Sequence, residues 1–182
     1  MGSDPVPLQT EFSVGLFIAI IALVIMSAFF SSTETAFSCA NRIKLRSLAT
    51  NGNKRAKKVL DLAETHYDKL ITTILIGNNI VNLSASTLAT LFFAKLILAE
   101  NVSAIVSTAS ITVAVLIFGE ITPKFIAKTY AEKMAMAFYP LIMFFYFIFF
   151  PFNLIFSGWK WLISKIFRVK DQEVVTEDEI LT

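Results

Sequence analysis

The sequence predicts an all-α membrane protein with three transmembrane helices, a basic helical loop in the cytoplasm and a further helix at the membrane surface. Composition supports this, because the 182 residues are 55% hydrophobic, include 18 Phe and are only 16% charged. The mean hydropathy of +0.67 is far above that of a soluble domain. Residues 12–30 carry no charge, and this run is too long for the apolar core of a cleaved signal peptide.

Three segments, residues 14–39, 70–98 and 102–124, are long enough to cross roughly 30 Å of hydrocarbon as helices. Basic residues gather between the first two segments: Arg42, Lys44, Arg46, Lys54, Arg55, Lys57, Lys58 and Lys69. The positive-inside rule therefore places this loop in the cytoplasm and residues 1–12 outside. The C-terminus is then cytoplasmic, in a multi-pass protein of the plasma membrane.

The basic loop is expected to form two short helices interrupted at "NGN", residues 51–53. Gly and Asn in this order are typical of a turn between helices. The simplest role of such a segment is contact with anionic lipid next to the membrane.

A fourth apolar region covers residues 134–156. If it crossed the bilayer, the basic residues of 160–170 would lie outside, against the positive-inside rule. The region 131–168 is therefore expected to lie along the cytoplasmic leaflet, broken at Pro140 and Pro151, with Trp159 and Trp161 at the interface. A tilted fourth crossing is the alternative. Residues 169–182 are expected to begin a linker to a cytoplasmic part that this sequence lacks.

Some chemistry is disfavoured by residue counts. One cysteine, Cys39, and one histidine, His66, argue against a disulfide framework and against a thiolate or imidazole metal site. The predicted spans contain no Asp, and His66 lies in the loop, so an intramembrane protease is not expected. The sequence predicts no enzyme, and any metal would be bound by oxygen.

Polar residues nevertheless occur inside the spans, at helical spacing. Two carboxylates, Glu34 and Glu120, would each cost several kcal/mol if they faced lipid, so both are expected to face the protein interior or water. The other polar positions share helix faces: Ser27, Ser31 and Ser38 with Glu34, Asn78 and Asn82 with Ser86, and Thr112 with Gly119. Counted from the cytoplasmic anchors, Glu34, Asn78 and Glu120 lie at one depth, about 12 to 14 Å into the membrane.

Pro123 follows Glu120 by three residues. Because proline has no N–H, it cannot donate to the carbonyl four residues earlier, which belongs to Gly119. A released carbonyl at membrane depth is tolerated where it lines a cavity or binds an ion. Together with hydroxyls, amides and carboxylates, it forms a set of oxygen ligands suited to Mg²⁺, Ca²⁺ or Na⁺. The alternative for the Ser and Asn residues is hydrogen bonding between packed helices.

Three motifs occur in order on the three predicted spans: "SAFFSSTETA" (residues 27–36), "GNNIVN" (77–82) and "GEITPK" (119–124). In this order the chain, from about residue 12 to 182, resembles the transmembrane domain of the CorC/CNNM (cyclin M) family of magnesium transporters. The resemblance implies a homodimer with three transmembrane helices and a belt-like juxtamembrane helix. It also implies paired CBS domains that bind nucleotide, which this sequence does not reach.

The same resemblance implies Mg²⁺ efflux, coupled to Na⁺ entry, through a dehydrated site in the membrane. The implied metal ligands are Ser27, Ser31, Asn78, Asn82, the Gly119 carbonyl and Glu120. Glu34 belongs to the motif "ETA" and is expected either to support the site, to bind the coupling ion or to serve helix packing. Lys124 would repel a cation, so its side chain is expected to extend to the interface.

A second class of function remains open, a membrane anchor or Mg²⁺ sensor that transports nothing and whose activity lies in the missing cytoplasmic part. In that class the polar residues would only assemble the dimer. Apart from the lipid bilayer and a second copy of the chain, no partner is expected, and nothing in the sequence points to nucleic acid.

Overall fold

The computed structural model describes residues 7–96, 100–152, 154–155 and 158–159. Residues 1–149 form one unit and residues 150–182 another, and the helices that concern us lie in the first. In chain order they are α1 (Pro7–Cys39), α2 (Arg42–Thr50), α3 (Lys54–Thr65), α4 (Tyr67–Leu96), α5 (Glu100–Ala114), the π-helix η1 (Val115–Ile121), α6 (Thr122–Thr129) and α7 (Ala131–Ile148). Of the predicted outer residues 1–12, the first six lie outside the described residues. So do residues 160–168 of the predicted surface region, with Trp161, and the predicted linker 169–182.

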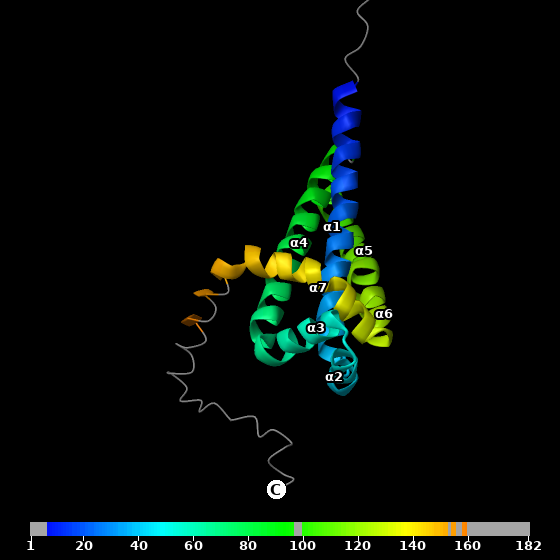
Figure 1. Ribbon diagram of the computed structural model, residues 1–182. Helices are drawn as coiled ribbons and strands as arrows, with labels where there is room; N and C mark the ends of the chain where they lie inside the picture. The colour runs from blue at the N-terminus through cyan, green and yellow to red at the C-terminus, as the bar shows by residue number, and fades with distance from the viewer. Residues whose placement is uncertain (1–6, 97–99, 153, 156–157, 160–182) are drawn as a thin grey trace, which may run out of the picture. The chain divides into compact units, whose positions relative to one another are not determined.

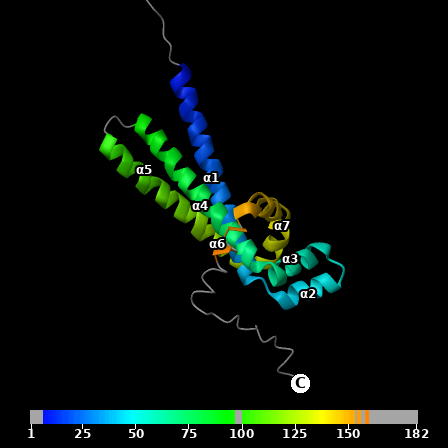
Figure 2. The same ribbon diagram turned by 90° about the vertical axis from the view of Figure 1, so that its left-hand side faces the viewer.

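The all-helical prediction is confirmed for the described part of the chain. Helix α1 packs against α4, and α4 packs against α5. The chain continues from α5 through η1 into α6, and both of these last segments pack on α1. Figures 1 and 2 show α4 running back along α1 and the α5–α6 segment returning beside it. The C-terminal half of α1 thereby lies among α4, η1 and α6.

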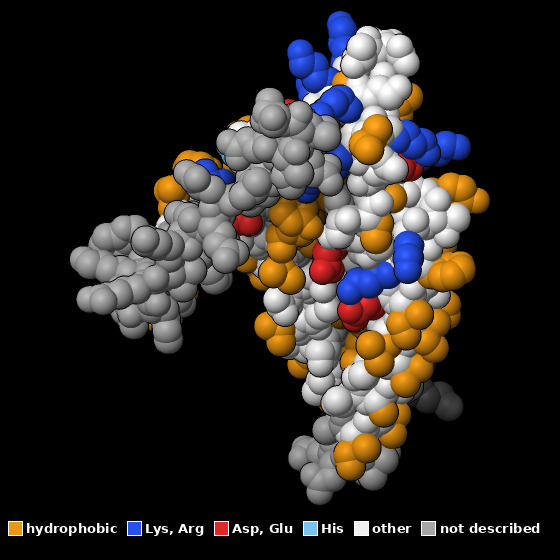
Figure 3. Space-filling model, turned by 90° about the horizontal axis from the view of Figure 1, so that it is seen from below, with side chains coloured by type: hydrophobic (Ala, Val, Ile, Leu, Met, Phe, Trp, Pro, Cys, Tyr) orange, Lys and Arg blue, Asp and Glu red, His pale blue; other side chains and the backbone are white. Residues whose placement is uncertain are grey.

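The basic loop forms the predicted pair of short helices. The Asn41 side chain caps α2 by accepting from the Lys44 N–H at 3.0 Å. The Asn53 side chain caps α3 by accepting from the N–H groups of Arg55 and Ala56. Between the helices Gly52 has φ +88°, a conformation that costs glycine little and other residues more. Lys and Arg side chains gather over this hairpin in the view from below (Figure 3).

Four stretches of the described chain are long and apolar enough to cross a membrane: Val14–Cys39, Tyr67–Ala94, Thr108–Thr129 and Ala131–Ile148. The first three correspond to the predicted spans, with the second and third displaced by a few residues. The fourth is α7, so length and composition alone admit one crossing more than the three expected. In Figures 1 and 2, however, α7 runs across α1 and α4 instead of along them.

Aromatic rings join α7 to α1. The ring of Phe138 lies 5.2 Å from that of Phe29, and the ring of Phe145 lies 5.0 Å from that of Phe30, measured between centroids. The Phe30 side chain is 1% exposed, and its ring also lies against Gly77 of α4, where a Cβ would collide with it. Gly77 therefore allows α4 to approach α1 closely, just before the polar positions of α4 begin.

Candidate cation site

The buried polar residues of α1 lie on the face that meets the other helices. Ser27 and Ser31 are 1% and 0% exposed, as their spacing of four predicts. Ser32 and Thr33 are also buried, and Thr33 satisfies its own hydroxyl by donating to the Phe29 carbonyl at 2.7 Å. Ser27 and Ser31 thus bring two hydroxyls to the centre of the helix junction.

Three helices meet at Ser27. Its hydroxyl donates to the Asn78 side-chain carbonyl of α4 over 3.4 Å, a long and therefore weak hydrogen bond. On the other side, a Cβ built on Gly119 of η1 would lie only 2.9 Å from Ser27 Oγ. The structure thus brings Ser27, Asn78 and Gly119 together, and the absent side chain at Gly119 makes room for the hydroxyl.

Two oxygens of the predicted ligand set are buried without a hydrogen-bond partner among the described residues: Ser31 Oγ and Asn82 Oδ1. Leaving such an oxygen unpaired costs about 1 to 3 kcal/mol. A folded protein retains such groups where strain, a water or an ion accounts for them. Both oxygens belong to the set of metal ligands that the family resemblance implies.

Asn82 and Glu120 line one small cavity between α4 and the α5–η1 segment. Its volume is about 230 Å³, and its other lining residues are Ser86, Ile111, Thr112, Val115 and Leu116. Because a water molecule takes about 30 Å³ in the liquid, this space is large enough for a cation that keeps some of its water. The cavity is thus lined by Glu120 and by Asn82, the residue whose amide oxygen is buried without a partner among the described residues.

The carboxylates Glu34 and Glu120 are both joined to Lys124. Its Nζ lies 3.0 Å from Glu120 Oε1 and 3.5 Å from Glu34 Oε2. The expectation that Lys124 extends away to the interface is therefore wrong for this conformation, in which its ammonium pairs with two carboxylates. Acidic and basic side chains meet in the middle of the face that Figure 3 shows, among apolar ones.

Around Pro123, which was predicted to leave the Gly119 carbonyl without its helical donor, the helix continues without a break. The backbone widens into the π-helix η1 just before Pro123, and the Thr122 N–H donates to the Ile117 carbonyl. Pro123 is buried at the start of α6, where a missing N–H is tolerated because the hydrogen-bond register changes there. π-Helical turns within α-helices are frequent at functional sites, and this one contains both Gly119 and Glu120.

Three residues of this region, Ser86, Thr112 and Lys124, were not predicted to belong to the site. Ser86 and Thr112 were recognised as members of polar faces but not as neighbours of Glu120, which only the packing of α4 against α5 reveals. The ion pair of Lys124 with Glu120 could have been predicted, since residues four apart meet on one face of a helix. The contact of Lys124 with Glu34 depends on the packing of α1 against α6 and had no signal in the sequence.

The chemistry of the site is that of uncharged oxygens and two carboxylates. Within the described ranges, no group of three or more His, Cys, Asp or Glu side chains gathers where a metal ion could bind. One or two carboxylates together with neutral oxygens or water are the ligands of a hard cation such as Mg²⁺.

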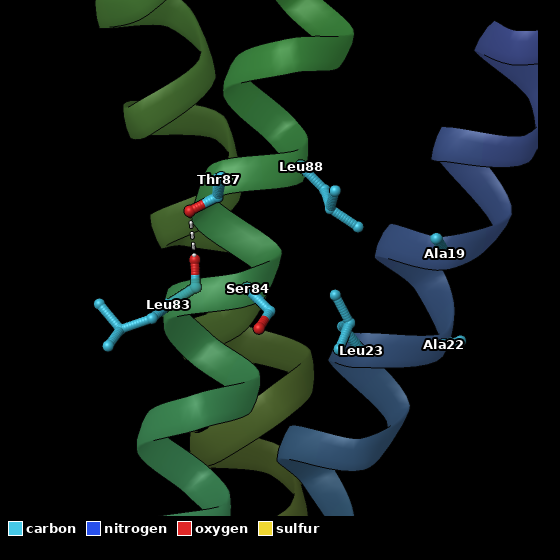
Figure 4. A pocket seen from close by; sticks show the side chains of 7 residues that line it. All are labelled: Ala19, Ala22, Leu23, Leu83, Ser84, Thr87 and Leu88. Atoms are coloured by element: carbon cyan, nitrogen blue, oxygen red, sulfur yellow. Dashed lines mark hydrogen bonds between the residues drawn. The ribbon is translucent and has the colours of Figure 1, made fainter.

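A larger groove, about 660 Å³, lies between α1 and α4 nearer the N-terminus of α1. Figure 4 shows Leu23 of α1 and Leu88 of α4 extending into the space between the two helices. The Thr87 hydroxyl donates to the Leu83 carbonyl of its own helix at 2.9 Å (Figure 4). The lining is mostly apolar, so this groove provides little that would bind an ion.

Comparison with known proteins identifies relatives over nearly the whole chain. The family model described as the cyclin M transmembrane N-terminal domain (CNNM) matches residues 18–182. A UPF0053 protein of Haemophilus influenzae is 39% identical over 150 residues, which are 76% of this chain and 34% of the relative. The UPF0053 inner membrane protein YfjD of Escherichia coli K12 is 38% identical over 144 residues, 79% of this chain and 31% of the relative.

A third relative carries a functional name. The polyamine export protein of Haemophilus influenzae is 30% identical over 175 residues, covering 88% of this chain and 40% of the relative. The matched region spans 31 to 40% of the length of these three curated relatives.

Proposed function

This chain belongs to the CNNM family of cyclin M transmembrane N-terminal domains, and from that premise we propose that it transports Mg²⁺ out of the cell through an intramembrane site of oxygen ligands. It is a multi-pass membrane protein, as its apolar helices and its inner-membrane relative indicate. The observation that carries the proposal is the pair of buried, unpartnered oxygens, Ser31 Oγ and Asn82 Oδ1. Asn82 and Glu120 also line the same cavity.

In this proposal Mg²⁺ is the transported substrate, and Glu120 supplies the formal negative charge. The neutral ligands are drawn from Ser27, Ser31, Asn78, Asn82 and the Gly119 carbonyl. Mg²⁺ demands near-octahedral oxygen geometry at about 2.1 Å and dehydrates reluctantly. A site that combines one or two carboxylates with several neutral oxygens can replace part of its water.

The proposed topology has three crossings, made by α1, α4 and the α5–α6 segment, with the N-terminus outside. Helix α7 is then the belt-like helix at the cytoplasmic surface. Its crosswise course in Figures 1 and 2 supports this, and so does its attachment to the basic hairpin, where Lys44 Nζ lies 3.2 Å from Glu132 Oε2. The hairpin and the start of α7 then share the cytoplasmic side, as the positive-inside rule requires.

Coupling to Na⁺ entry, assembly as a homodimer and location in the plasma membrane are parts of the same proposal. Hydroxyl, amide and carboxylate oxygens also suit Na⁺, so one set of ligands can serve both ions in turn. Nucleotide binding is proposed only for cytoplasmic CBS domains outside this sequence.

The test is Mg²⁺ binding by calorimetry and Mg²⁺ flux in proteoliposomes, with Glu120→Ala and Asn82→Ala. We expect both variants to lose at least tenfold in affinity and most of the flux, because each removes a ligand oxygen. Asn79→Ala is the matched control, since Asn79 is exposed and donates to the Leu75 carbonyl of its own helix. If the wild-type chain binds Mg²⁺ and both variants match it, the proposed site is wrong.

If these substitutions change the association of the chain but leave ion movement untouched, the anchor or sensor class is favoured instead. Chemical crosslinking in the same proteoliposomes measures association separately from flux. Transport therefore requires that flux and affinity fall together while association stays constant.

A polyamine is a second candidate substrate, favoured by one observation in addition to the relative named a polyamine export protein. The primary ammonium of Lys124 lies between Glu34 and Glu120, so this pair of carboxylates can accept an alkylammonium group. Addition of spermidine to the Mg²⁺ binding assay separates the two candidates. Strong competition by spermidine, together with its flux, would favour the amine, whereas Mg²⁺ binding indifferent to spermidine would favour the metal.

A further inference from the structure

Lys124 bridges two acidic residues that come from different helices. Glu120 belongs to η1, one turn before Lys124, whereas Glu34 belongs to α1. The three side chains are about one third exposed, so the ammonium remains within reach of both carboxylates without being sealed among them. An ordinary pair on the surface of one helix would involve Glu120 alone.

The position of this ammonium conflicts with cation binding. A divalent cation on Glu120 would lie within a few ångströms of Lys124 Nζ, which is 3.0 Å from the same carboxylate. Like charges so close together in a medium of low dielectric repel strongly. The cation and the ammonium therefore compete for the carboxylates.

Resting on the function proposed above, we propose that Lys124 is a tethered counter-ion that occupies the carboxylates of Glu34 and Glu120 when the site is empty and is displaced by the transported cation. The tether is the four-carbon side chain, and α6 ends only five residues further on, at Thr129. A lysine near the end of a membrane helix can extend its ammonium to the interface. When the cation displaces it, the Lys124 ammonium can therefore move to the membrane interface.

The counter-ion has a consequence for transport. Without Lys124, the empty protein would hold two uncompensated carboxylates at membrane depth, and charged groups there are costly. With Lys124 bound to them, the empty and the cation-loaded states both keep the carboxylates paired. The empty protein can then return to its loading conformation with both carboxylates still paired. A cation that binds must first displace the Lys124 ammonium.

The first test uses the wild-type chain in detergent and reductive methylation with formaldehyde, with each lysine quantified by mass spectrometry. Displacement predicts that methylation of Lys124 rises severalfold at saturating Mg²⁺ but not in matched Na⁺-free choline chloride. Lys128, exposed one turn further along α6, is the internal reference and should not change. Methylation of Lys124 that is constant or lower with Mg²⁺ would overturn the proposal.

The second test measures Mg²⁺ affinity and flux in Lys124→Met, with Lys124→Arg and Lys128→Met for comparison. Removal of the competitor should tighten Mg²⁺ binding about five- to tenfold, the scale of a partly exposed ion pair to two carboxylates, while net flux falls because the empty state carries bare charge. Lys124→Arg keeps a cation and should restore weaker binding, and Lys128→Met should resemble the wild type.

A lysine that only joins helices predicts the opposite result, namely weaker binding in Lys124→Met. That outcome would overturn the proposal that Lys124 is a displaceable counter-ion. The proposed function would still stand as long as the wild type binds Mg²⁺. If the wild type binds no Mg²⁺, the proposed function fails first. Should Lys124→Met not fold, the methylation result on the wild type decides alone.

Discussion

Helices α1 and α4 meet in two regions of opposite character. Towards the N-terminus of α1 they leave the apolar groove lined by Leu23 and Leu88, about 660 Å³ in volume. Towards its C-terminus they close on Ser27, Ser31 and Phe30, all 1% exposed or less. Within a bilayer, apolar surface gains little from burial against another helix, so close packing and polar contacts determine where helices join. The closed junction therefore combines the close packing of α1 and α4 with the polar side chains of the proposed site.

The largest expected effect is at Gly77, where the Phe30 ring occupies the space that a side chain would need. Gly77→Leu should force α4 away from α1, because a ring packed among α1, α4 and α7 cannot yield, and overpacking of this size costs about 3 kcal/mol or more. We expect loss of the monodisperse folded protein by size-exclusion chromatography and a large fall in Tm. Gly15→Leu is the control, since Gly15 has nothing within 4 Å; an equal effect of both changes would show that the junction is not special.

The next effect in size is at Gly119, whose added Cβ would meet Ser27 Oγ at 2.9 Å. Gly119→Ala should destabilise the chain by about 1 to 2 kcal/mol, because the hydroxyl must give way. The measurement is Tm in detergent.

Ser27→Ala provides the partner for a double-mutant cycle. Combined with Gly119→Ala, it removes the crowding oxygen and should recover about 1 kcal/mol relative to the sum of the single changes. Strict additivity would mean that the two residues are not in contact.

The difference between the two regions also explains what the sequence could predict. Helical spacing was enough to place Ser27, Ser31, Asn78 and Asn82 on inward faces, because a period of 3.6 residues is a local property. The break at "NGN" was likewise predictable from local turn chemistry. These predictions depend only on neighbours in sequence.

The predictions that were wrong depend on contacts between helices, which are not a local property of the sequence. Pro140 was expected to break the region 131–168, but α7 continues through it from Ala131 to Ile148. Lys124 predicted an interfacial ammonium, but the approach of α1 adds Glu34 as a second carboxylate. The crosswise course of α7 follows from its aromatic contacts with Phe29 and Phe30, which hydropathy does not report. In the counter-ion scheme, the interfacial position would belong to the cation-loaded state.

The smallest effect on stability, and the sharpest contrast between the regions, is expected from removing one hydroxyl in each. In the junction, Ser31 Oγ has no partner among the described residues, so Ser31→Ala removes an unpaired buried oxygen and should leave stability unchanged or raise it by up to about 1 kcal/mol. In the groove, the Thr87 hydroxyl is already bonded to Leu83, so Thr87→Val should change stability by less than about 0.5 kcal/mol. Stability alone thus hardly separates the two variants.

Mg²⁺ affinity separates Ser31→Ala from Thr87→Val, because in the proposed site the unpaired Ser31 oxygen binds the cation and the Thr87 hydroxyl does not. Ser31→Ala should weaken Mg²⁺ binding about tenfold, the loss of one neutral ligand, while Thr87→Val should bind like the wild type. Calorimetry measures the affinity and Tm the stability on the same samples. If Ser31→Ala were instead markedly less stable with unchanged affinity, its hydroxyl would serve helix packing, and the junction would differ from the groove only in how tightly it is closed.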